Sequence, residues 1–243
     1  FGALIGAWLG HRFDQGSGFD FDGLAKKTDE DRQATFFYSA FATMGFIAKA
    51  NGQVTQHEIA FATAYMNKLD LNAEMKQQAQ DAFQEGKMAD FPLEQQLKKF
   101  KRSCFNRHDL LLLFLEIQIQ VAFADGELDS AEKEALHRIA KILGFSADQL
   151  DQLLEMIIAG AHFHGQNGKQ ATTTQQVDNA YKVLGVNKSD SDQIIKKAYR
   201  KLMSQHHPDK LVAKGLPTEM MEVAKQKAQD IQAAYEMISE NKK

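Results

Sequence analysis

Residues 195–210 read IKKAYRKLMSQHHPDK, a segment that joins an amphipathic helix to an abrupt stop. At about 100° per residue, the apolar and aromatic side chains fall on one helical face and the basic side chains cover the other. The first face holds Ile195, Ala198, Tyr199, Leu202 and His206, and the second holds Lys196, Lys197, Arg200 and Lys201. The helix is expected to end at His207, because Pro208 disfavours helical geometry in the residue before it.

Two further helices are expected around this segment. A short helix at 178–184 ends at Gly185, a residue suited to the C-cap, and the next helix begins at Ser189 or Asp190. Residues 218–239 repeat apolar positions every three or four residues, which predicts another helix. Its apolar positions are Val223, Ala224, Ala228, Ile231, Ala234, Tyr235 and Ile238. The two longer helices should pair antiparallel, with His207, Pro208 and Asp209 exposed at the connecting tip.

The central region, residues 29–160, also has helical periodicity. Its first apolar face holds Phe36, Phe37, Ala40, Phe41, Met44, Ile47 and Ala48, and a later one holds Leu110, Leu113, Phe114, Ile117 and Val121. Helix starts are expected at the Thr55–Glu58 capping box, Asn72, Pro92, Asn106, Asp129 and Ser146. Because the whole chain has only three prolines, long uninterrupted helices are feasible and the predicted fold class is all-α.

An internal repeat runs through this central bundle. Residues 47–58 and 121–132 both contain an apolar helix end, an Asx-Gly turn, an apolar residue two positions later and a helix start with glutamate. Both residues of an Asx-Gly pair tolerate positive φ, which suits a tight turn. Val54 and Leu128 are expected to fill the core between successive helices.

The repeat resembles the TerB-like helical domain of the tellurite-resistance family. That resemblance implies paired acidic loops able to hold a cation, for which the weak candidates here are Asp125, Asp129 and Glu132. The first copy keeps fewer carboxylates, with Asn51, Thr55 and Glu58 at the matching positions. A turn followed by a helix cap explains the same residues and is preferred, so no metal site is assigned.

The last 67 residues resemble a J domain. Three landmarks occur in order, namely NAYKVLGV at 179–186, IKKAYRKL at 195–202 and HHPDK at 206–210. The resemblance implies a domain that binds DnaK-type chaperones and stimulates their ATP hydrolysis. It further implies that His207, Pro208 and Asp209 are the trigger, and that an acidic partner surface is docked by Lys196, Lys197, Tyr199, Arg200 and Lys201.

The N-terminal segment has a different character, because residues 1–9 carry no charge. A membrane-spanning helix needs about 20 apolar residues, so residues 1–10 are interpreted as the remnant of an N-terminal transmembrane helix. Gly2, Gly6 and Gly10 share one helical face, a spacing that lets two membrane helices dimerise closely. Residues 11–28 are expected to be a juxtamembrane connector. The alternative is a glycine-rich apolar arm packed on its own domain.

Charge and composition separate the remaining parts. Residues 161–176 are poor in apolar side chains and predict a flexible linker between a bundle at 29–160 and a J domain at 177–243. The J-domain segment carries 12 basic and 9 acidic residues, whereas the whole chain has a net charge of −3. That weak overall charge gives no indication of a nucleic-acid partner.

Together the parts resemble the membrane-anchored DnaJ-like co-chaperones of Gram-negative bacteria. The resemblance implies a single-pass protein of the bacterial inner membrane, with the bulk of the chain in the cytoplasm, a DnaK-type partner and a homodimer through the membrane segment. The single cysteine, Cys104, excludes the zinc-binding repeats of a full DnaJ. No cofactor is expected, and the absence of a nucleophile–base pair or phosphate loop argues against an enzyme. The alternative function is a cation-sensing or protein-interaction module that uses the J fold as an adaptor.

Overall fold

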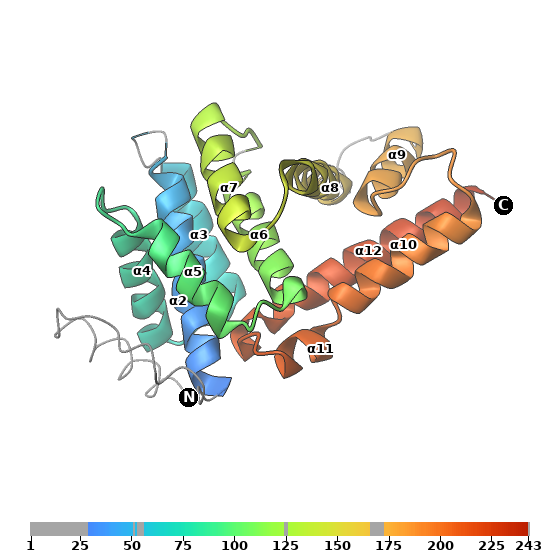
Figure 1. Cartoon of the computed structure of the whole chain (residues 1–243). Coiled ribbons are helices and arrows are strands. Elements are labelled where there is room, and N and C mark those ends of the chain that lie inside the picture. The colour runs from blue at the N-terminus through green and yellow to red at the C-terminus, as the bar shows by residue number, and fades with distance from the viewer. Residues whose placement is uncertain (1–28, 51, 53–55, 124–125, 166–172, 243) are drawn as a thin grey trace.

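The computed structural model describes residues 29–50, 52, 56–123, 126–165 and 173–242. Every regular element within these ranges is a helix, so the all-α prediction is confirmed. Figure 1 shows a bundle formed by the N-terminal helices and, beside it, a long hairpin formed by the C-terminal helices.

The bundle is built around α2 (Asp29–Ala48), whose predicted apolar face is fully buried. The other helices are α3 (Gln56–Lys68), α4 (Ala73–Gly86), α5 (Leu93–Ser103), α6 (His108–Ala122), α7 (Ser130–Leu143) and α8 (Ala147–Gly165). Phe36 of α2 makes edge-to-face contacts with Phe100 and Phe114, at ring-centroid distances of 5.4 Å and 5.9 Å. Such pairs add to the free energy of burial, so this aromatic cluster joins α2, α5 and α6 into one core.

Several helix starts follow the sequence-based expectation. Asn72 accepts a hydrogen bond from the Met75 backbone at 2.9 Å, which caps α4. Asp129 and Glu132 form a reciprocal capping box at the start of α7, with bonds of 2.7 Å and 3.0 Å. These bonds satisfy amide groups that have no partner within the helix.

Two expected starts are wrong in detail. Pro92 is the N-cap of α5 and lies just before its first turn. Asn106 does not cap α6, because Arg107 takes the N-cap and Asn106 adopts a φ of 52° in the preceding turn. Asparagine tolerates this left-handed geometry better than most residues, so it suits a left-handed turn as well as a helix N-cap. The capping box expected at Thr55 lies outside the described residues.

The C-terminal part contains α9 (Thr173–Val183), α10 (Asp192–Gln205), α11 (Pro208–Ala213), the 3-10 turn η2 (Thr218–Met220) and α12 (Met221–Asn241). Helices α10 and α12 form the expected antiparallel pair (Figure 1). The Lys242 ammonium closes the end of this pair by binding the Asp192 carboxylate at 2.8 Å.

Three boundaries in this part differ from the expectation. Helix α10 begins after Ser191, whose hydroxyl accepts from the Ile194 backbone, and the proposed starts at Ser189 and Asp190 are therefore too early. Helix α9 begins five residues before Asp178. The short helix α11 was not expected, because Pro208 ends one helix and also suits the first position of the next.

The flexible linker expected at 161–176 is partly helical. Helix α8 continues to Gly165, α9 starts at Thr173, and the two helices pack against each other. Ala159 of α8 belongs to the same buried cluster as Val177 and Ala180 of α9. Packing against α9 therefore extends α8 into a segment whose composition alone favours a coil. Residues 166–172 lie outside the described part.

The expected membrane remnant, with Gly2, Gly6 and Gly10, and the connector at 11–28 also lie outside the described residues. From residue 29 onward, none of the described helices combines the length and the apolar character needed to cross a membrane.

Candidate functional site: an exposed His-Pro-Asp loop mounted on the helical bundle

The His-Pro-Asp loop lies at the tip between α10 and α12, as the sequence predicts. His207 is extended, with φ −65° and ψ 120°, and Pro208 opens α11. The side chains of His207 and Asp209 are exposed, and neither has a hydrogen-bond or ion-pair partner within the part of the chain that the structure describes. Both polar groups are therefore available to a second protein.

A basic surface leads toward this loop along α10. Four basic side chains form this surface, namely Lys196, Lys197, Arg200 and Lys201. All four are exposed, and none takes part in an ion pair with another described residue. Four uncompensated cations on one helix attract an acidic surface over a range set by the ionic strength. The structure thus places the expected docking residues on α10 and the expected trigger directly after the end of that helix, at the start of α11.

Tyr199, the fifth expected docking residue, occupies a different environment. It is half-buried, and its ring stacks on Tyr235 of α12 at 4.3 Å with an interplanar angle of 17°. The ring therefore joins α10 to α12 and can offer only part of its surface to a partner.

The segment that follows the loop is fixed to the N-terminal bundle. Leu211 and Leu216 are fully buried in the same apolar cluster as the cores of α2 and α6. The Lys214 ammonium contacts the Asp109 carboxylate in the first turn of α6. The guanidinium of Arg107, the N-cap of α6, donates to the Lys214 carbonyl at 2.8 Å. The tip of the hairpin is therefore mounted on the start of α6.

The residue that precedes the loop is held by the same helix. His206 and Glu116 are each 1% exposed, with 3.5 Å between imidazole Nδ1 and carboxylate Oε2. The Lys227 ammonium of α12 lies 3.4 Å from the other carboxylate oxygen. Glu116, His206 and Lys227 thus form a buried charged cluster between α6 and the hairpin. Burial lowers the pKa of the His206 imidazole, while the Glu116 carboxylate opposes that shift.

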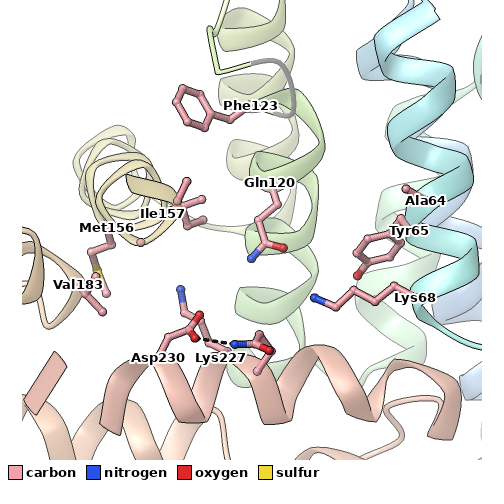
Figure 2. Close-up of a pocket in the computed structure, with 13 residues that line it drawn as sticks. Ala64, Tyr65, Lys68, Gln120, Phe123, Met156, Ile157, Val183, Lys227 and Asp230 are labelled. Atoms are coloured by element: carbon pink, nitrogen blue, oxygen red, sulfur yellow. Dashed lines mark hydrogen bonds between the residues drawn. The ribbon is translucent and has the colours of Figure 1, made fainter. Parts of the chain in front are cut away.

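A cavity of about 500 Å³ lies beside the buried charged cluster (Figure 2). Helix α12 forms its floor, while α3, α6 and α8 supply the surrounding walls. The wall near α8 is apolar, with Met156 and Ile157, and Lys68 points in from α3. The junction between bundle and hairpin is therefore packed near the tip of the hairpin and open farther along α12.

Sequence reasoning missed this junction. It assigned His206 to the inner face of α10, which is correct, but not to a contact with α6. The signal was present in α6, where Leu110–Leu115 are apolar without a break and all buried. A helix that is apolar on all sides is buried on all sides, and its one central acid, Glu116, then needs a cationic partner.

Two of the three weak cation-site candidates lie in the described part of the structure, and both of them cap a helix. Asp129 and Glu132 use their carboxylates for the capping box of α7. Asp125 lies outside the described residues. No group of three or more potential metal ligands occurs among the residues that the structure describes.

Comparisons with known proteins cover both parts of the chain. The family model for tellurite resistance protein TerB matches residues 38–155, and the model for the DnaJ domain matches residues 179–243. No solved structure gives a significant match.

Curated relatives match along nearly the whole chain. The chain is 51% identical to the co-chaperone protein DjlA of Photobacterium profundum, over 98% of this chain and 91% of that protein. It is 48% identical to the protein of that name from Vibrio cholerae, over 97% and 90% of the two chains. The corresponding protein of Yersinia pestis is 47% identical, over 99% and 91%.

Proposed function

Because the chain belongs to the family of co-chaperone protein DjlA, we propose that it binds a DnaK-type chaperone and stimulates the ATP hydrolysis of that partner. The observation that carries the proposal is the exposed His-Pro-Asp loop beside an exposed basic helix. The role is that of a regulator, since the ATP is hydrolysed by the partner.

The chemistry of the loop suits a trigger. Asp209 offers a free carboxylate to an arginine or lysine of the partner, a charge-assisted contact that is stronger than a neutral hydrogen bond. His207 can donate or accept, and Pro208 fixes the backbone between them at low entropic cost. The basic surface of α10 would bring an acidic partner surface to this loop and set the encounter rate.

The direct test is steady-state ATP hydrolysis by a purified DnaK-type chaperone with and without the chain. Replacing Lys197 and Arg200 by glutamate should raise the chain concentration needed for half-maximal stimulation by about tenfold, because two attractive contacts become repulsive. The difference should shrink as salt rises. Lys182→Glu on α9 is the control, since Lys182 is also exposed but lies off the basic surface. Equal shifts for both variants would contradict the docking role of α10.

We further propose that residues 1–10 belong to a membrane helix that anchors the chain in the bacterial inner membrane, with the J domain in the cytoplasm. The uncharged run supports this interpretation, and the Gly2, Gly6 and Gly10 spacing supports a homodimer through that helix. An anchored J domain would recruit its chaperone to the membrane surface.

A membrane self-association reporter tests the dimer. Leucine at Gly2, Gly6 and Gly10 should lower the reporter signal to that of a monomeric control, because larger side chains keep the two helices apart. Leucine at Ala3 and Ala7, which lie on another face, should leave the signal high. An unchanged signal after the glycine replacements would refute the dimer.

A further inference from the structure

We propose that α6 of the N-terminal bundle positions the His-Pro-Asp loop, and that Glu116 is the positioning residue, acting through His206. The inference rests on the proposed function and extends it from the J domain to the neighbouring bundle. It assigns the bundle a role in the maximal stimulation of the partner, separate from the docking role of α10.

The loop is held on both sides by α6. His207, Pro208 and Asp209 lie between two attachments, and both attachments are on α6. Before the loop, His206 contacts Glu116 at 3.5 Å. After it, the Lys214 carbonyl accepts from Arg107 at 2.8 Å. Residues 207–213, which include the whole of α11, are thus held at both ends and have few orientations left, so α6 sets the direction in which the trigger residues project.

The buried charged cluster has polar atoms that depend on one another. Both Glu116 carboxylate oxygens and both His206 nitrogens are buried without a hydrogen bond from any described residue. Glu116 contacts His206 Nδ1 through one oxygen and the Lys227 ammonium through the other. Lys227 is only 9% exposed. A buried ion pair adds little stability when intact, but removing one partner is strongly destabilising because the other stays uncompensated. Glu116 therefore controls whether the hairpin fits α6 in this register.

The junction is open beyond the cluster, where the cavity of about 500 Å³ separates α12 from α3 and α8, so side chains there contribute few contacts across it (Figure 2). Nearer the loop, Met220, Val223 and Ala224 pack in the core of the bundle. Glu116 lies between the packed and the open part, so its loss should loosen the fit of the hairpin on α6.

The trigger residues stay accessible in this arrangement. With the hairpin mounted on α6, His207 and Asp209 remain exposed, as do the four basic residues of α10. The packed arrangement thus presents the trigger and leaves it uncovered. Loss of the arrangement should weaken the trigger while the docking surface, on the far side of α10 from α12, persists.

The test uses the whole 243-residue chain with Glu116→Leu, which keeps the approximate side-chain volume and removes the charge. Titration against a fixed amount of a DnaK-type chaperone yields two quantities, the maximal stimulation and the half-saturating concentration. The maximal stimulation should fall at least about tenfold, since a 1 Å misplacement transmitted from a distance can lower a rate by up to about a hundredfold. The half-saturating concentration should stay within about twofold of wild type, because α10 is untouched. A general loss of folding would change both quantities.

Lys227→Met tests the cluster from the opposite side, on α12. The same fall in maximal stimulation is expected, and the double variant should lose no more than either single variant, because both replacements remove one shared contact. Additive losses would contradict a shared contact and overturn the inference.

Gln118→Leu is the matched control. Gln118 is also buried on α6, but its amide donates to the Ala40 carbonyl inside the bundle at 3.4 Å. The control should retain wild-type stimulation. Wild-type stimulation by Glu116→Leu, or an equal loss in Gln118→Leu, would overturn the positioning role.

A wild-type chain that fails to stimulate the chaperone would contradict the proposed function itself, and the positioning role would then be refuted as well.

Hydrogen exchange provides a readout that does not depend on the chaperone. In the wild type, the Leu211 amide bonds to the His207 carbonyl at 3.1 Å, within the mounted loop. Glu116→Leu should accelerate exchange at residues 207–216 and leave the α10 amides protected. Unchanged exchange at 207–216 would overturn the inference.

Discussion

A chain with His207→Gln should fold like the wild type and lose most of its ability to stimulate a DnaK-type chaperone. The side chain of His207 is exposed and makes no hydrogen bond or ion pair within the described part of the chain, so its replacement should change the free energy of unfolding by less than about 0.5 kcal/mol. A hydrogen bond to a charged group contributes about 1.5–3 kcal/mol, so losing one such contact should lower stimulation about tenfold to hundredfold.

The measurement pairs steady-state ATP hydrolysis with thermal unfolding monitored by circular dichroism. Ala213→Gln is the matched control, because it places the same amide at an exposed position at the end of α11. It should stimulate like the wild type. Asp209→Asn should behave like His207→Gln, since it removes the free charge of the loop. Full stimulation by His207→Gln would refute the trigger mechanism.

Gly86→Ala should destabilise the bundle by roughly 3 kcal/mol or more, at the upper end of the cost of overpacking. A β-carbon at Gly86 would lie 1.8 Å from the Ala42 carbonyl oxygen, and one at Gly45 would lie 2.0 Å from the Phe83 carbonyl oxygen. Two glycines on facing helices thus allow α2 and α4 to approach through their backbones. An added methyl group meets rigid backbone, so the helices must separate and the aromatic core must loosen.

Thermal unfolding measures this effect, and the melting temperature should fall by about 10 °C, at roughly 2–4 °C per kcal/mol for a chain of this size. Gly160→Ala in α8 is the control. Its β-carbon would meet nothing closer than Val183 at 3.9 Å, and alanine favours a helix interior by about 0.5–1 kcal/mol. The control should therefore melt at or above the wild-type temperature. A Gly86→Ala protein as stable as the control would show that α2 and α4 are farther apart than described.

Local rules recovered most of the secondary structure. Helix ends were found where a side chain satisfies backbone groups close in sequence, as Asn72 does for α4 and Asp129 for α7. Pro208 was found because its ring constrains the residue before it. The exposed His-Pro-Asp loop was predicted from the constraint that Pro208 imposes, and the basic surface was predicted from the amphipathic pattern of the helix before it.

The errors arose where two local rules compete or where distant packing intervenes. Asn106 suits both an N-cap and a left-handed turn, and the turn prevails at the end of α5. Residues 161–165 have the composition of a coil but are helical, because α8 continues into its contact with α9. The composition of a segment does not reveal such contacts, because they depend on helices that follow later in the sequence.

The sequence by itself determined the all-α fold, the internal repeat and the exposed His-Pro-Asp turn, because each depends on spacing within one or two helices. The resemblance to a J domain then implied that this turn is the trigger. Only the tertiary structure decided what the trigger is mounted on. Glu116 lies on α6, whereas His206 and Lys227 belong to the C-terminal hairpin, and no periodicity links them. Their contact exists because a buried carboxylate must meet a cation, and the fold alone determines which cation lies within reach.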